Sequence, residues 1–77
     1  MNQFMLHQHL AQVEKHVRQG AQSIARQHRI IANLRQGGRD PAMALRLLSL
    51  FEKCQGLHVD HRDRLEAELS KDLIQGR

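Results

Sequence analysis

Histidines are the side chains in this sequence with the widest chemical range. There are six of them in 77 residues, together with one cysteine. His28, His58 and His61 fall within the apolar patterns of two predicted helices, where an imidazole must hydrogen-bond its ring nitrogens. Because residues three apart lie on adjacent helical turns, His58 and His61 could share a metal ion with His16 or Asp60.

Three interpretations of His58 and His61 follow: packed or interface histidines, a metal site, or a pH-sensitive assembly. Di-iron sites in helical bundles use several glutamates and Glu-x-x-His pairs. This sequence has no Glu-x-x-His pair. We favour packed or interface histidines, and we expect no metal and no cofactor.

Groups for acid-base or nucleophilic catalysis are poorly placed. The serines lie inside predicted helices, without the orienting groups that an activated nucleophile needs. Asp60 and Asp63 could be imagined as an acid and a base, but Arg62 and Arg64 beside them favour surface ion pairs. We therefore expect no enzymatic activity.

The elements that must position these residues are two long helices. Large apolar residues recur in steps of three, four and seven, which keeps them on one helical face over about residues 3–36. These residues are Leu6, Leu10, Val13, Val17, Ile24, Ile31 and Leu34. A second helix over about residues 41–75 has the pattern Leu47, Phe51, Cys54, His58, His61, Leu65, Leu69 and Leu73. As a member of this pattern, Cys54 is expected to be buried.

Residues 37–41, Gly-Gly-Arg-Asp-Pro, predict a tight turn between the helices. A glycine can adopt the left-handed conformation that ends a helix, Asp40 can cap the next one, and Pro41 suits its first position. So short a connection makes the second helix run back beside the first. The expected fold is all-α, an antiparallel two-helix hairpin forming one domain over residues 1–77.

A folding point near Gly38 also predicts which residues face each other. Positions whose numbers add up to about 77 would lie opposite, so His58 and His61 would face residues 16–21. Gly20 in this segment would then admit a bulky side chain such as an imidazole.

Apolar side chains extend beyond what two helices can cover, because a helix pair buries only one line of each partner. A second copy, giving a coiled-coil-like four-helix bundle, is the simplest cover, and a different protein is the other occupant. We therefore expect a homodimer that acts as a small protein-protein interaction or adaptor module. The expected interface residues are Ile30, Leu34, Leu47, Leu50, Phe51, Cys54, Leu57, His58 and His61.

The formal net charge of +4 is unevenly divided. Residues 3–35 hold five basic residues and one acidic residue, whereas residues 40–75 hold five basic and seven acidic residues. A basic helix beside an acidic one predicts ion pairs between the helices. The alternative is binding of nucleic acid, in particular RNA, by the outward cations of the first helix. These cations are Lys15, Arg18, Arg26 and Arg29.

Composition argues against several other classes of partner. With two Phe and no Trp or Tyr, the chain has little to stack on a base, a flavin or a sugar ring. No apolar run approaches the roughly 20 residues of a membrane-spanning helix. The first residues lack the pattern of a secretory signal, and a lone thiol, Cys54, fits a reducing compartment. We expect a cytoplasmic protein with no membrane partner.

Three segments resemble a group of short uncharacterised bacterial helical proteins, and the likeness spans most of the chain. They read HLAQVEKHV (9–17), IARQ (24–27) and LHVDHRDRL (57–65). This resemblance implies a stand-alone bacterial hairpin of unknown function, and it brings no catalytic or binding residues. In size and architecture alone, the chain is also similar to the Rop-type RNA-binding dimers, in which two-helix hairpins pair into four-helix bundles.

Overall fold

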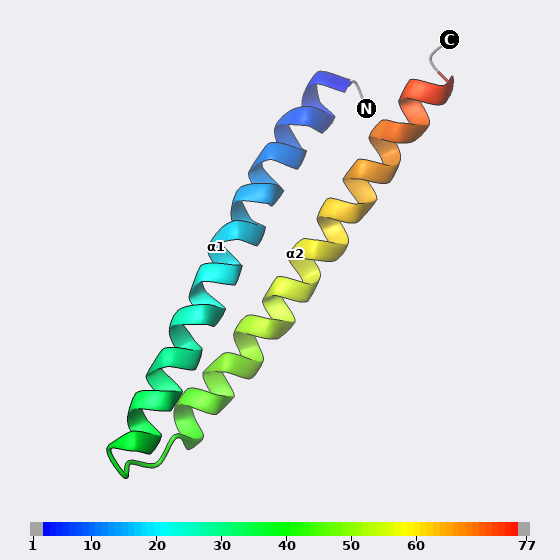
Figure 1. The fold of residues 1–77 in the computed structure, drawn as a ribbon. Helices are drawn as coiled ribbons and strands as arrows, with labels where there is room; N and C mark the ends of the chain where they lie inside the picture. The colour runs from blue at the N-terminus through cyan, green and yellow to red at the C-terminus, as the bar shows by residue number, and fades with distance from the viewer. Residues whose placement is uncertain (1–2, 76–77) are drawn as a thin grey trace.

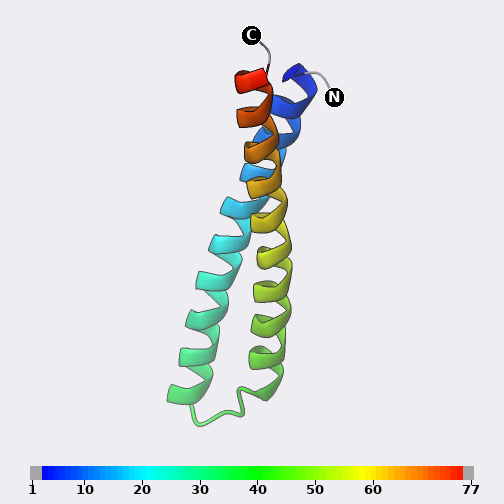
Figure 2. The same cartoon turned by 90° about the vertical axis from the view of Figure 1, so that its right-hand side faces the viewer.

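The computed structural model describes residues 3–75, with the side chains of residues 3–71, and it shows two helices lying side by side (Figure 1). Helix α1 spans Gln3–Gln36 and helix α2 spans Ala42–Gln75. No strand occurs in this part of the chain, so the predicted antiparallel helical hairpin is confirmed. The hairpin is a rod of 62 × 14 × 14 Å along its principal axes (Figure 2).

Helix α1 ends in a Schellman motif. The N–H of Gly38 donates to the carbonyl of Arg35 at 3.1 Å, and the N–H of Arg39 donates to the carbonyl of Leu34 at 2.8 Å. Gly38 has a φ of 70°, in the left-handed region that L residues with a Cβ rarely adopt. The prediction that a glycine closes this helix is confirmed.

Helix α2 begins with the predicted cap. Oδ1 of Asp40 accepts a hydrogen bond from the backbone N–H of Ala42 at 3.0 Å, and Pro41 lies between them. The carbonyl of Pro41 accepts the N–H of Leu45 at 2.9 Å. Pro41 therefore lies directly before α2, which starts at Ala42, one residue later than expected.

The buried core is small and lies mostly at the end of the rod away from the turn, here called the open end. Its cluster consists of Leu6, Val13, Leu65 and Leu69, with Leu10 and Val17 packed against it. Towards the turn, Ile31 and Leu48 are buried. The side chain of Leu73, expected in this pattern, lies outside the described residues.

Two glutamines connect the helices through hydrogen bonds to the backbone. Nε2 of Gln27 donates to the carbonyl of Ala44 at 2.9 Å, and Nε2 of Gln55 donates to the carbonyl of Val17 at 2.8 Å. Val17 is thus opposite residue 55, whereas the expected pairing placed it opposite residue 60. In the contacts between the helices, the numbers of facing residues add up to 71–75 rather than about 77, so the predicted register was off by about two to six residues. These polar contacts cannot be inferred from loop length.

Gly20 does allow a close approach, but its neighbour is not the expected imidazole. A Cβ added to Gly20 would lie 2.8 Å from Cδ of Gln55 and would collide with that side chain. The missing side chain of Gly20 therefore makes room for Gln55 to reach the carbonyl of Val17.

The face of α2 that meets α1 differs from the predicted one. Leu48 is buried and Gln55 is half-buried, whereas Cys54 and His61 are exposed; His28 on α1 is exposed as well. The prediction that Cys54, His61 and His28 lie in the helix-helix contact was therefore wrong. Leucines at adjacent positions give α2 two overlapping apolar series, offset by one residue, and packing selects the one that contains Leu48.

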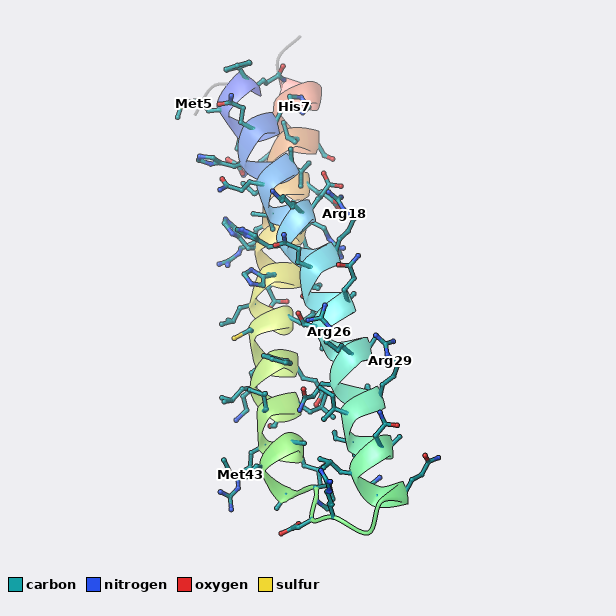
Figure 3. All side chains as sticks on the ribbon, turned by 90° about the vertical axis from the view of Figure 1, so that its left-hand side faces the viewer. Met5, His7, Arg18, Arg26, Arg29 and Met43 are labelled. Carbon is teal, nitrogen blue, oxygen red and sulfur yellow. The ribbon has the colours of Figure 1, made fainter. Side chains whose placement is uncertain are left out.

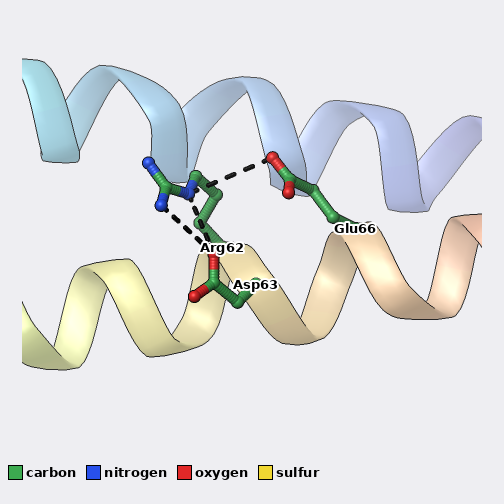
Figure 4. Close-up of polar contacts among 3 residues, drawn as sticks. All are labelled: Arg62, Asp63 and Glu66. Atoms are coloured by element: carbon green, nitrogen blue, oxygen red, sulfur yellow. Dashed lines mark hydrogen bonds and ion pairs between the residues drawn. The ribbon is translucent and has the colours of Figure 1, made fainter.

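Ion pairs occur within α2 rather than between the helices. Arg62 pairs with Asp63 at 3.1 Å and approaches Glu66 at 4.0 Å (Figure 4). Within residues 3–71 no ion pair joins α1 to α2, so the expected inter-helix pairing of charges was wrong. The hairpin is held by apolar contacts and the two glutamines.

Candidate interaction surface

Three hollows follow one another along the hairpin between α1 and α2, and together they are here called the groove. Its hollow near the open end and its central hollow share His16 and His58, and a third hollow continues towards the turn. Residues from both helices line all three hollows. The groove is open to solvent along its length, so it is a surface that another helix could occupy rather than an enclosed cavity.

The part of the groove near the turn is almost wholly apolar and has a volume of about 490 Å³. Its apolar lining consists of Ile30, Leu34, Met43, Ala44, Leu47 and Leu50. Met43 is 73% exposed, Leu50 57%, Leu47 41% and Ile30 40%. Solvation of so many large side chains is unfavourable, and contiguous apolar surfaces of this kind are typical of interaction sites.

These exposed residues on α2 follow a regular spacing. Alternating steps of four and three residues describe a line on the helix surface, here called the outer stripe. It consists of Met43, Leu47, Leu50, Cys54, Leu57 and His61. This is the spacing of a coiled-coil seam, and it lies one position away from the series that already packs on α1.

The part of the groove near the open end is lined by histidines. His9, His16, His58 and His61 border this hollow, and the rings of His16 and His58 lie 5.2 Å apart between centroids, tilted by 46°. His16 and His58 are half-buried, whereas His9 and His61 are exposed. The structure thus brings His58 to His16, as expected, without placing the ring of His61 in the same contact.

No metal centre is formed by this arrangement. Among the described side chains, no three His, Cys, Asp or Glu residues lie close enough together to bind one ion. The triad once considered, His58 and His61 with His16 or Asp60, is therefore not assembled within a single hairpin. The central hollow places the exposed Cys54 beside Ser23 and Phe51, again without such a cluster.

One buried polar atom in the groove lacks a partner. Oε1 of Gln55, which lines the central hollow, accepts no hydrogen bond from the described residues, although Nε2 of the same amide is bonded to Val17. A buried acceptor without a donor is unfavourable. The amide is held in place by its donor side alone.

Sequence reasoning missed Met43, Gln27 and Gln55, and a signal for one of them, Gln27, was present. The predicted apolar series of α1 contained steps of seven, from Val17 to Ile24 and from Ile24 to Ile31. A step of seven omits one contact position, and the omitted positions are Gly20 and Gln27, both of which lie in the helix-helix contact. Gly20 was already expected to allow a close approach, whereas Gln27 was overlooked because its side chain is polar.

The cations of α1 form a second surface, away from the groove. Arg18 and Arg29 extend from one side of α1, and Met43 lies at the opposite edge of the hairpin in the same view (Figure 3). Lys15, Arg18, Arg26 and Arg29 are exposed, and none of them forms an ion pair within residues 3–71. Their charges therefore remain available to an external anion.

The hairpin exposes more surface than a compact chain of its size. Its accessible area is 6031 Å² for a mass of 8.9 kDa, compared with about 4,800 Å² for a typical folded monomer of that mass. Its radius of gyration is 17.5 Å, compared with about 11.5 Å for a compact domain of this length. The difference in area exceeds the roughly 800 Å² that each partner buries in a standard interface.

Fold and groove together define a helical-hairpin protein with an apolar groove on one side and a cationic surface on α1. Neither helix, over the described residues, has an apolar stretch long enough to cross a membrane. No family model matches the sequence, and no curated protein or solved structure matches it either. The resemblance to short bacterial helical proteins therefore stays a prediction.

Proposed function

We propose that this chain is a small, non-enzymatic interaction module that works as a homodimer, with the groove as its self-association surface. Two hairpins would pack groove to groove into a four-helix bundle. The outer stripe of α2 carries this proposal, because coiled-coil spacing on an exposed face is the pattern that another helix recognises. As an adaptor, the bundle would present its remaining faces to other proteins.

The small core supports the same proposal. Among the described side chains, six apolar ones are buried, whereas eight large ones are between 39% and 73% exposed. A single core in a chain of this length stabilises the fold by only about 3 to 5 kcal/mol. Burial of the outer stripe would add to this core, so association and folding would support each other.

A matched pair of substitutions tests the proposal. Leu47 lines the apolar hollow and is 41% exposed, whereas Leu45 does not line it and is 39% exposed on the same helix. Leu47→Glu places a charge in the proposed interface, and we expect self-association to weaken by at least about 100-fold. Leu45→Glu adds the same charge outside it and should leave the dimer intact.

Sedimentation equilibrium of the wild type and both variants provides the measurement, with circular dichroism as a check on helix content. A wild type that stays monomeric and helical at micromolar concentrations would contradict the proposal. Equal effects of the two substitutions would also contradict it, since the groove would then have no special role.

Binding of nucleic acid through α1 is the second candidate function. The observation that favours it is the set of exposed cations without carboxylate partners on that helix. Lysine and arginine that neutralise phosphates release counterions, so the affinity would fall steeply with salt. The phosphate backbone, rather than base edges, would be the ligand.

Glutamine substitutions distinguish this surface from general charge effects. Replacing Arg18, Arg26 and Arg29 together by Gln should lower the affinity for duplex RNA. It should also make the plot of log affinity against log salt concentration less steep, by up to about three units of slope. The matched control replaces Arg62, Arg64 and Lys71 on α2 by Gln, which changes net charge equally and leaves the lining of the groove intact. Fluorescence anisotropy across a salt series measures both, and equal losses in the two triple variants would reject a specific α1 surface.

A further inference from the structure

We infer that the second copy binds antiparallel, with its α2 against α2 of the first, so that the two turns lie at opposite ends of the bundle. This inference rests on the proposed homodimer and specifies its geometry. The two-fold axis would cross the rod near residue 52, between Leu50 and Cys54. Three features favour this geometry: the outer stripe, the charges beside it, and the residues that would face α2 in the other arrangement.

The outer stripe is complementary to itself when it is reversed. In an antiparallel coiled coil centred near residue 52, Leu47 meets Leu57 of the second copy, and Leu50 meets Cys54. At the ends of the contact, Met43 meets His61. Each large exposed leucine of the stripe thus contacts an apolar residue, and each contact occurs twice by symmetry.

Charges beside the stripe fit the same alignment. Arg46 and Asp60 are exposed on α2 and flank the stripe on the side away from α1, as does Lys53. In the antiparallel alignment Arg46 lies opposite Asp60 of the second copy, which gives two attractive pairs per dimer. Lys53 lies opposite its own copy near the axis, where solvent screens the single repulsion.

The other two-fold arrangement places both turns at the same end and α2 opposite α1 of the second copy. At the observed register, Leu50 would then face Ser23 and Leu57 would face His16. Two of the most exposed leucines would be paired with polar side chains that need hydrogen-bond partners. Self-pairing of α2 avoids this mismatch for Leu50 and Leu57.

The native thiol makes the alignment testable. In Leu50→Cys, the new thiol lies opposite Cys54 of the second copy, and mild oxidation should give a covalent dimer on non-reducing gels. Leu45→Cys, which also keeps Cys54, is the matched control, and it should give no more covalent dimer than the wild type does.

A distance measurement checks the same alignment without a disulfide in the interface. With Cys54→Ser and a spin label on Arg39→Cys in the turn, the antiparallel dimer places the two labels about 40 Å apart along the rod at 1.5 Å per residue. The arrangement with both turns together places them within about 20 Å, roughly two helix diameters.

Covalent dimers of Leu50→Cys and the longer distance are the expected results. A dimer in sedimentation with the shorter label distance would overturn the antiparallel alignment and leave the proposed function standing. A monomer in sedimentation would overturn both.

Discussion

Gly20 and Gln55 form a single structural unit at the scale of residues. Glycine inside a helix costs about 1 kcal/mol relative to alanine. Here its missing Cβ gives space to Gln55, whose Nε2 hydrogen-bonds the carbonyl of Val17 at 2.8 Å. The helix gives up intrinsic stability at this position, and the hydrogen bond between the helices offsets that loss.

A double-mutant cycle measures the interaction between Gly20 and Gln55. Gly20→Ala alone should be nearly neutral, because the gain in helix propensity is offset by displacement of Gln55 from its hydrogen bond, worth about 1 kcal/mol. In a Gln55→Ala background the same substitution should stabilise the hairpin by about 1 kcal/mol. Urea unfolding of the four proteins gives the coupling energy, and strictly additive effects would show that the two residues do not interact.

The identity of the partner of Gly20 could not have been predicted from the sequence. A glycine in a long helix indicates a close approach, and this expectation was correct. The expected imidazole was wrong because the partner depends on the register, and a shift of about three residues along α2 replaces His58 by Gln55. Polar side chains such as Gln55 and Gln27 are usually assigned to the solvent, so a pattern of apolar residues does not include them.

At the scale of elements, the turn is determined by its own residues. Gly38 supplies the left-handed conformation and Asp40 caps α2, and both contacts involve neighbours within a few positions. Such local signals are readable from the sequence, which explains why the helices and the connection were predicted well. The face of α2 that meets α1 was not, since it depends on contacts between segments far apart in the chain.

The two turn glycines differ in a way that substitution can measure. Gly38→Ala should destabilise the hairpin by about 1 to 2 kcal/mol, because alanine disfavours a φ of 70°. Gly37→Ala should change stability by no more than about 0.5 to 1 kcal/mol, since its φ is not positive and a Cβ there makes an ordinary contact with the Asn33 carbonyl at 3.5 Å. Thermal unfolding of both variants provides the comparison. A similar loss in both would mean that the backbone conformation of Gly38 is not the cause.

At the scale of the whole molecule, the hairpin exposes an area greater than its length requires, and the groove accounts for much of its apolar part. The sequence predicted an excess of apolar residues, and it included Ile30, Leu47, Leu50 and Leu57 among them. The sequence did not distinguish the outer stripe from the residues of α2 that contact α1. Two apolar series offset by one residue run along α2, and only the packing of α1 shows which of them is buried.

Coupling between association and folding predicts an unfolding midpoint that depends on protein concentration. A dimer that unfolds to two chains is favoured by mass action, so a 100-fold increase in concentration should raise the midpoint by about 5 to 10 °C. Leu47→Glu should show little dependence if the groove is the interface. Circular dichroism melts at several concentrations test this, and a midpoint of the wild type that does not move would indicate a hairpin that folds alone.

The rod also has two halves that are fastened by different forces. At the open end the helices are joined by the leucine and valine cluster, whereas the half near the turn has, in addition to buried Ile31 and Leu48, the capped connection and the Gln27 bond to Ala44. Attraction between apolar groups weakens on cooling, because it is largely entropic near room temperature. We therefore expect cooling to separate the two helices first at the open end, while the turn keeps its structure.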